Sequence, residues 1–149
     1  ISAIRNYKRA ILLNPTKASL YNDFGVYSDN IGLKIPIINS YKRALFINPT
    51  LSLAHNNLGI LLYTDRHHEN KTAILQYKKA TTLNPNIEEF YNNLATSLKT
   101  IGNLKQAMAM FRRSLTINPI YIEAIENTVN MELQLNLLEV ALIKLFGMM

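Results

Sequence analysis

Cysteine is absent from the sequence, and no apolar run approaches the length of about 20 residues that a membrane-spanning helix needs. The missing cysteine excludes disulfides, a thiolate metal site and a cysteine nucleophile. The first residues also lack the basic, apolar and small-residue order of a signal peptide. We therefore expect no association with membranes, no export, and a cytoplasmic location.

Motifs that carry catalysis are missing as well. The sequence has neither a glycine-rich phosphate loop nor a nucleophile elbow. One cluster, His67-His68-Glu69, suggests a metal site, but no third ligand with zinc-like spacing follows it, and we interpret it as a variable loop. We interpret His55 as a packing residue. We predict no catalytic residue, no cofactor and no bound metal, so that the chain by itself is not an enzyme.

An Asn-Pro dipeptide recurs along the chain. Its prolines are Pro15, Pro49, Pro85 and Pro119, which lie 34, 36 and 34 residues apart. A fixed period of this size indicates stacked helical units. Proline cannot continue a preceding helix, and asparagine tolerates the left-handed conformation that often ends one. Each dipeptide therefore closes one unit.

Residue types also recur at fixed distances from these prolines. The tenth residue after each proline is Gly25, Gly59, Ala95 or Val129. The eighth residue before each proline is Tyr7, Tyr41, Tyr77 or Phe111. Small side chains allow two helices to cross closely while large neighbours fill the flanks. Each unit is thus predicted to be a helix pair that needs its neighbours to bury its apolar face.

This combination of aromatic, small and proline positions resembles the tetratricopeptide repeat in spacing and residue type over essentially the whole chain. The resemblance implies an all-α fold, a right-handed α-solenoid of antiparallel helix pairs that forms a superhelix with a concave groove. The expected division of the single array 1–149 is a half repeat 1–17 that holds a second helix, repeats 18–51, 52–87 and 88–121, and a divergent or truncated repeat 122–149.

Finer details of the array follow from the same pattern. The repeat 52–87 carries a two-residue insertion in the loop within its pair. Turns within pairs are expected near residues 30–32, 65–69 and 101–103, where turn-forming residues occur. A fourth pair over about 121–146 would bring the number of helices to nine.

Amide side chains recur on the first helix of each pair. Seven residues after each proline stand Asn22, Asn56, Asn92 and Glu126. Eight residues after each proline stand Asp23, Asn57, Asn93 and Asn127. A carboxamide can bond both the C=O and the N–H of an extended peptide backbone, so a row of amides facing the groove predicts a peptide-binding site. The alternative interpretation is a solvated polar helix face.

The stretch Tyr91-Asn92-Asn93-Leu94-Ala95 resembles repeats of the O-linked N-acetylglucosamine transferase and Spindly-like glycosyltransferase group. In that family an asparagine ladder holds substrate polypeptides. The resemblance implies that Asn57, Asn93 and Asn127 contact a bound peptide, whereas Asp23 departs from the pattern because it cannot donate.

Half of the 16 positive charges lie in four adjacent pairs on the second helices, Lys8-Arg9, Lys42-Arg43, Lys78-Lys79 and Arg112-Arg113. With the net charge of +6, such a stripe could meet an anionic partner or nucleic acid. We favour a solvating role and a favourable interaction with the helix dipole, because no aromatic platform for bases accompanies the pairs.

The predicted function is a protein-interaction scaffold that binds extended polypeptide segments in its concave groove. The alternative is a substrate-recruiting arm of a larger enzyme such as a protein O-glycosyltransferase, because both ends look cut from a longer chain. Positions at which related repeats clamp a chaperone's C-terminal carboxylate hold Ser19, Leu53 and Glu89, and this chemistry disfavours that ligand. Proteins or peptides are the expected partners, nucleic acid is not, and the uncapped ends are expected to allow self-association.

Overall fold

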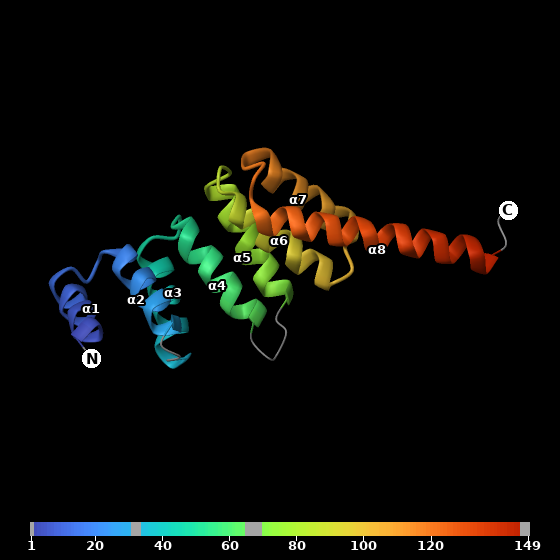
Figure 1. Ribbon diagram of the computed structural model, residues 1–149. Coiled ribbons are helices and arrows are strands. Elements are labelled where there is room, and N and C mark those ends of the chain that lie inside the picture. Colours follow the sequence, from blue (N-terminus) through green and yellow to red (C-terminus); the bar gives the residue numbers. More distant parts are fainter. Residues whose placement is uncertain (1, 31–33, 65–69, 147–149) are drawn as a thin grey trace. The chain divides into compact units, whose positions relative to one another are not determined.

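The computed structural model describes residues 2–30, 34–64 and 70–146, and within these ranges it contains helices and turns but no strand (Figure 1). The helices are α1 (Ser2–Leu13), α2 (Ala18–Asn30), α3 (Lys34–Ile47), α4 (Ser52–Thr64), α5 (Asn70–Leu83), α6 (Glu88–Thr100), α7 (Leu104–Ile117) and α8 (Ile122–Phe146). The predicted all-α class is confirmed.

The Asn-Pro junctions end a helix and start a tight turn. The N–H of Asn118 donates to the carbonyl of Ser114 at 3.0 Å and closes the last helical turn. Its side-chain oxygen then accepts from the N–H of Ile120 at 3.2 Å, as Asn48 accepts from Thr50 at 3.0 Å. Asn118 has φ −134° and ψ 96°, an extended conformation that the following proline favours. At this junction the asparagine therefore does not use the left-handed conformation that it tolerates at helix ends.

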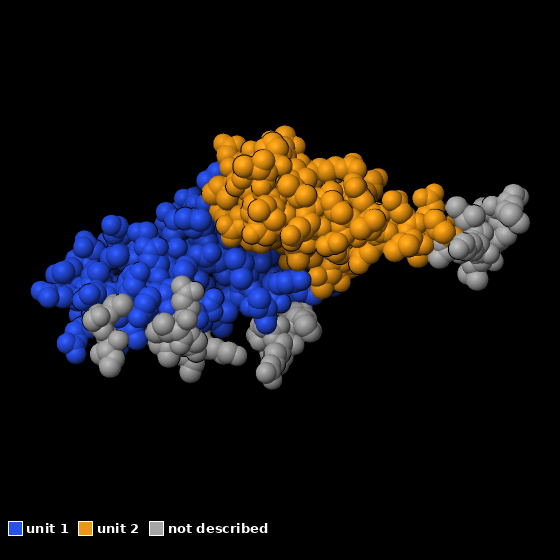
Figure 2. Space-filling model, viewed as in Figure 1, with its two compact units in different colours: residues 1–85 blue, residues 86–149 orange. Residues whose placement is uncertain are grey.

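Unit 1, residues 1–85, contains two complete helix pairs, α2 with α3 and α4 with α5 (Figure 2). A Cβ atom added to Gly25 would lie 2.6 Å from Cε1 of Tyr41, and one added to Gly59 would lie 2.7 Å from Cε1 of Tyr77. Both rings are buried. The small residues thus stand where the helices of a pair touch, as predicted from their spacing.

Successive pairs within unit 1 share a core. The buried residues Ile37 and Tyr41 of α3 cluster with Leu58 of α4, and partly buried leucines pack around them. This cluster therefore joins one pair to the next, which is the stacking that the repeat pattern predicts.

Unit 2, residues 86–149, begins with the pair α6 and α7. The two helices are joined through Gly102, whose φ of +79° favours glycine. Asn103 caps α7 by accepting a hydrogen bond from the N–H of Gln106 at 3.4 Å. The predicted turn at 101–103 is confirmed, whereas the turn predicted at 65–69 and most of the one predicted at 30–32 lie outside the described residues.

The predicted fourth pair is wrong, because α8 is one continuous helix of 25 residues. Asn136 stands in α8 at the distance from its proline at which Gly102 makes the turn between α6 and α7. Without glycine a left-handed turn there is costly, and the surrounding leucines favour helix. The described residues accordingly hold eight helices rather than nine.

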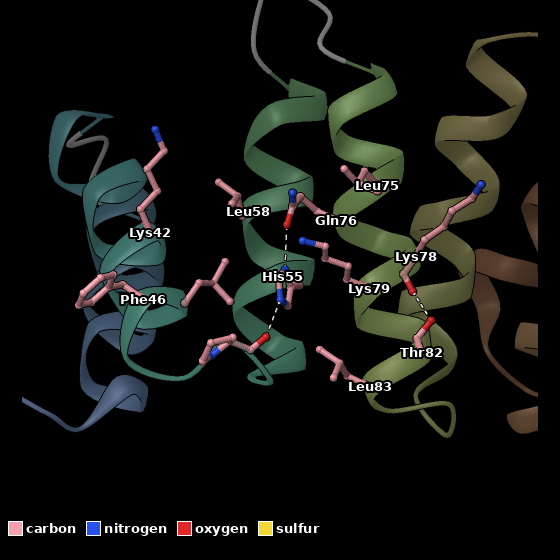
Figure 3. Close-up of a pocket in the computed structure, with 12 residues that line it drawn as sticks. Lys42, Phe46, His55, Leu58, Leu75, Gln76, Lys78, Lys79, Thr82 and Leu83 are labelled. Carbon is pink, nitrogen blue, oxygen red and sulfur yellow. Dashed lines mark hydrogen bonds between the residues drawn. The ribbon is translucent and has the colours of Figure 1, made fainter.

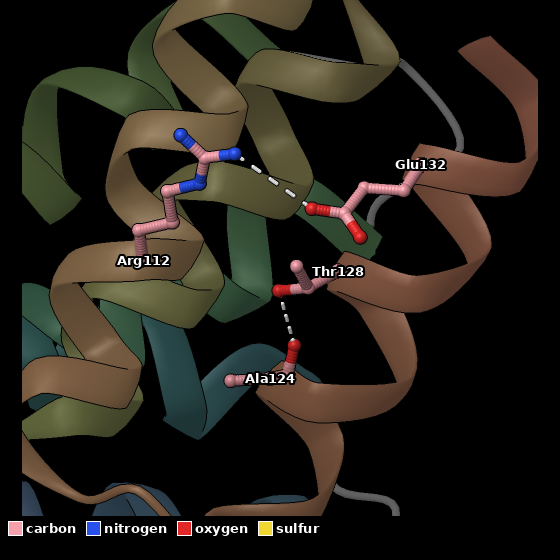
Figure 4. A network of polar contacts seen from close by, with 4 residues as sticks. All are labelled: Arg112, Ala124, Thr128 and Glu132. Atoms are coloured by element: carbon pink, nitrogen blue, oxygen red, sulfur yellow. Dashed lines mark hydrogen bonds and ion pairs between the residues drawn. The ribbon is translucent and has the colours of Figure 1, made fainter. Parts of the chain in front are cut away.

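The first half of α8 packs on α6 and α7 through Ala124 and Met131, which are buried. Thr128, also buried, satisfies its hydroxyl by donating to the carbonyl of Ala124 at 2.7 Å (Figure 4). At the surface, Arg112 of α7 pairs with Glu132 at 3.7 Å. An exposed pair of this kind contributes little, so apolar packing holds α8 in place.

Candidate functional site

The predicted groove residues divide into two kinds by burial. Asn22, Asn56 and Asn92, seven residues after their prolines, are 6%, 1% and 7% exposed. The residues that follow them are more open. Asn57, Asn93 and Asn127 are half-buried, and Asp23 is exposed. Only the second kind presents substantial side-chain surface to a ligand.

The two kinds are joined by a recurring hydrogen bond, which we call the amide clasp. In unit 1, Nδ2 of Asn57 donates to Oδ1 of Asn22 at 3.0 Å, and in unit 2, Nδ2 of Asn127 donates to Oδ1 of Asn92 at 3.1 Å. The partners are 35 residues apart in both cases, which is one repeat plus one residue. Our sequence analysis missed the clasp, although this shared spacing was the signal that could have revealed it.

The amide clasp fixes what each outer amide can offer. An asparagine side chain has two N–H hydrogens and one oxygen, so Asn57 and Asn127 each keep one donor and one acceptor. A donor and an acceptor on one planar group match the C=O and N–H of a peptide backbone. Because the clasp already orders the side chain, less rotamer freedom is lost when a ligand binds.

Asp23 departs from this arrangement. Its carboxylate accepts from Nδ2 of Asn22 at 3.3 Å, and it has no N–H to offer a ligand. Asp23 also lines a cavity of about 270 Å³ together with Tyr7, Val26 and Tyr27. The amide row is therefore chemically different at its N-terminal end.

His55 has a structural role at the start of α4. Its Nε2 lies 3.0 Å from the carbonyl of Pro49, just as the hydroxyl of Tyr21 donates to the carbonyl of Pro15 at 3.1 Å one repeat earlier. A carbonyl only accepts, so Nε2 carries the hydrogen. Nδ1 lies 2.8 Å from Oε1 of Gln76. The histidine replaces a tyrosine as the donor that ties the helix to the preceding junction.

Two of the basic pairs contact aromatic rings. The guanidinium of Arg43 lies 5.2 Å from the ring centre of Phe46, and that of Arg113 lies 5.8 Å from the ring centre of Tyr91. These are cation–π distances. The prediction that the pairs have no aromatic neighbours is wrong here, but each guanidinium covers a ring face that a nucleic-acid base would need.

Burial and nearby carboxylates perturb two tyrosines. Burial, and then Asp29, raises the pKa of Tyr41 to about 12. Burial, followed by the carboxylates of Glu123, Glu89 and Glu88, raises the pKa of Tyr121 to about 12.

Glu88 itself is shifted in the opposite direction. It accepts a hydrogen bond from the side chain of Asn118 at 2.8 Å, and this bond, with one from its own backbone, lowers the pKa of the carboxyl. The junction after α7 is thereby tied to the start of α6.

Neither a metal-binding cluster nor a membrane-spanning helix occurs among the described residues. The described ranges contain no group of three or more His, Cys, Asp or Glu side chains that could hold a metal ion, and His67-His68-Glu69 falls outside them. In the same ranges, no helix combines the length and the apolar character needed to cross a membrane.

Comparison with known proteins agrees with this architecture. Residues 88–121 match the family model of the tetratricopeptide repeat, while no curated protein matches the chain. The crystal structure of MamA is similar with a TM-score of 0.78 and 24% identity, covering 91% of this chain and 78% of MamA. The first tetratricopeptide domain of Spaghetti (RPAP3), bound to the HSP90 peptide SRMEEVD, is similar with a TM-score of 0.74 and 18% identity, covering 80% and 94%.

The fold, an all-α solenoid of stacked helix pairs, defines the class as helical-repeat proteins. Within that class, residues 88–121 match the tetratricopeptide repeat, and the fold of the chain is similar to that of a solved tetratricopeptide domain.

Proposed function

We propose that this chain is a protein-interaction scaffold that binds extended polypeptide segments through the outer amides of its first helices. Repeat solenoids use such extended surfaces to bind other molecules. The observation that carries the proposal is the amide clasp, which occurs with the same partners and spacing in both units. The outer amides that bind the peptide are Asn57 in unit 1 and Asn93 and Asn127 in unit 2.

The binding chemistry favours backbone over side-chain recognition. Each outer amide donates one N–H to a peptide carbonyl and accepts from a peptide N–H. The buried residues Asn22 and Asn92 hold Asn57 and Asn127 in place instead of contacting the ligand, and Asn56 is too buried to contact it. A site of this type accepts segments of varied sequence, provided that their backbone is extended and unpaired.

A solved structure of similar fold supports a peptide ligand. The Spaghetti (RPAP3) domain holds a peptide from HSP90. We do not propose the same peptide for this chain, because the positions predicted to hold a carboxylate are Ser19, Leu53 and Glu89, which provide no positive charge. The two similar structures named above favour the scaffold over the enzyme arm that the sequence left as an alternative.

The test is capture of partners from cell lysate, identified by mass spectrometry, with the wild-type chain beside an Asn57→Ala, Asn93→Ala, Asn127→Ala variant. Each lost amide costs about 0.5–1.5 kcal/mol of binding, so the triple variant should bind at least about tenfold more weakly. Circular dichroism must show that the variant is folded.

A gain-of-function variant supplies the matched control. Asp23→Asn adds the missing donor at the exposed end of the amide row and should strengthen binding of the same partners. Loss of stability cannot produce such a gain. Equal capture by the wild type and the triple variant, together with no gain from Asp23→Asn, would refute the proposal.

A further inference from the structure

The second helices of unit 1 enclose a separate groove, between α3 and α5 and with α4 behind it (Figure 3). Its volume is about 650 Å³, which lies within the range of small-ligand and side-chain pockets. Leucines line it, and two large apolar side chains at its edges are open to solvent, Phe46 at 76% and Leu75 at 52% exposure. The groove therefore offers apolar surface that nothing in unit 1 buries.

The charged side chains that line this groove, among the residues that the structure describes, have one sign. Lys42, Lys78 and Lys79 are all exposed, and none of the described lining residues is Asp or Glu. Three ammonium groups around an apolar hollow attract a partner that carries carboxylates beside an apolar side chain.

The corresponding groove one repeat earlier, between α1 and α3, differs in size and chemistry. It has a volume of about 460 Å³, and its charged lining residue is Arg43. Asn39 there occupies the position of Leu75, and Tyr21 that of His55. In the α3–α5 groove, His55 has a shorter side chain than Tyr21 and leaves more space. Leu75 replaces the amide of Asn39 and makes the groove more apolar. Its properties therefore come from its particular residues and not from the repeat fold alone.

We propose that the α3–α5 groove is a second docking site, which binds an acidic segment of a partner protein. A bulky apolar side chain of that segment enters between Phe46 and Leu75. Carboxylates on either side of it meet the three lysines. The lysines, Phe46 and Leu75 belong to second helices, whereas the amide row lies on first helices, so different residues form the two sites.

A protein segment fits this groove better than a nucleic acid does. A base needs a free aromatic face and partners for its polar edges. The guanidinium of Arg43 already covers a face of Phe46, at 5.2 Å from the ring centre, and the leucines cannot satisfy polar edges.

The experiment is selection of a random peptide-display library on the immobilised full chain, followed by fluorescence anisotropy of each enriched peptide. Binding is compared among the wild type, Leu75→Glu, and the double variant Lys42→Glu, Lys78→Glu. The matched control is Lys8→Glu, Arg9→Glu on α1, which changes the net charge by the same amount at residues that do not line the groove. All substituted side chains except those of the control pair line the groove, and all are exposed, so folding is retained and is checked by circular dichroism.

The expected result is a group of peptides with Asp or Glu flanking a large apolar residue. Both groove variants should weaken their binding by about tenfold or more, while the control changes it by less than about twofold. Failure to enrich such peptides, or equal binding by the groove variants, would overturn the proposal. So would a fluorescent single-stranded oligonucleotide that binds the wild type and is lost with Leu75→Glu.

The Asn57→Ala, Asn93→Ala, Asn127→Ala variant separates the two sites. Peptides lost with that variant and retained by Leu75→Glu belong to the amide row and support only the proposed function. If every enriched peptide behaves in this way, the groove proposal fails while the proposed function stands.

Discussion

At the scale of single residues, the close contact between a glycine and an aromatic ring sets the geometry of each helix pair in unit 1. Alanine normally stabilises a helix relative to glycine by about 1 kcal/mol. At Gly59, however, a Cβ atom would lie 2.7 Å from Cε1 and 2.9 Å from Cδ1 of Tyr77, whose ring is buried and cannot move freely. This steric clash should outweigh the gain in helix propensity, so that alanine at position 59 destabilises the helix pair.

We therefore predict that Gly59→Ala lowers the free energy of unfolding by about 1–2 kcal/mol, because overpacking a core costs about 1–3 kcal/mol. Urea denaturation followed by circular dichroism measures the change. In a Tyr77→Leu background the clash is absent, and the same substitution should no longer destabilise. A stable Gly59→Ala variant in the wild-type background would show that the helices can separate.

Alkaline stability depends on the two perturbed tyrosines. Tyr41 and Tyr121 have pKa values raised to about 12 in the folded chain, above the ordinary value of 10.0, because burial disfavours the tyrosinate. The stabilisation is fully present below pH 10.0 and is lost as the pH rises through about 12. We expect the free energy of unfolding to fall over this window, and to fall less in Tyr41→Phe. Urea titrations at several alkaline pH values measure both curves, and parallel curves would contradict the assignment.

At the scale of elements, the amide clasp connects first helices of successive repeats. The bond from Asn127 to Asn92 links α8 to α6, and the bond from Asn57 to Asn22 links α4 to α2. Each hydrogen bond of this kind contributes about 0.5–1.5 kcal/mol to the free energy of unfolding. Replacing the donor asparagine leaves the Oδ1 atom of its buried partner without this hydrogen bond, which adds a penalty.

A double-mutant cycle tests this contribution. Asn92→Ala and Asn127→Ala should each destabilise unit 2, and the double variant should lose less than the sum by about 0.5–1.5 kcal/mol. Chemical denaturation gives the three values. Strict additivity would mean that the two amides do not interact in solution.

At the scale of the whole molecule, stability is expected to be local. Within each unit, helices contact those near them in the chain, which makes the array close to a one-dimensional stack. A substitution should therefore be felt most strongly in its own pair.

Hydrogen exchange of the full chain tests this locality with the variant Gly59→Ala. Amide exchange should rise in α4 and α5, the helices that hold Gly59 and Tyr77, and should change much less in α7 and α8. A uniform increase along both units would show that the chain unfolds as a single cooperative body.

The limits of prediction from sequence are visible in particular residues. Asn136 lies where a turn was expected, yet α8 continues through it, because whether a weak turn residue ends a helix depends on the packing available to the second helix. The adjacent residues Asn56 and Asn57 were both predicted to face a ligand, but Asn56 is buried. Contacts between repeats decide which of two adjacent amides is buried, and the sequence does not show these contacts.

The sequence by itself determined the repeat period, the all-α class, the glycine crossings and the recurrence of adjacent amides, because these depend on local spacing and side-chain size. The tertiary structure decided the amide clasp, the hydrogen-bond partners of His55, the single helix α8 and the lysine-lined groove between α3 and α5. Each of these features brings together side chains from different helices, and spacing along one chain does not specify how such side chains share space, hydrogen bonds and solvent.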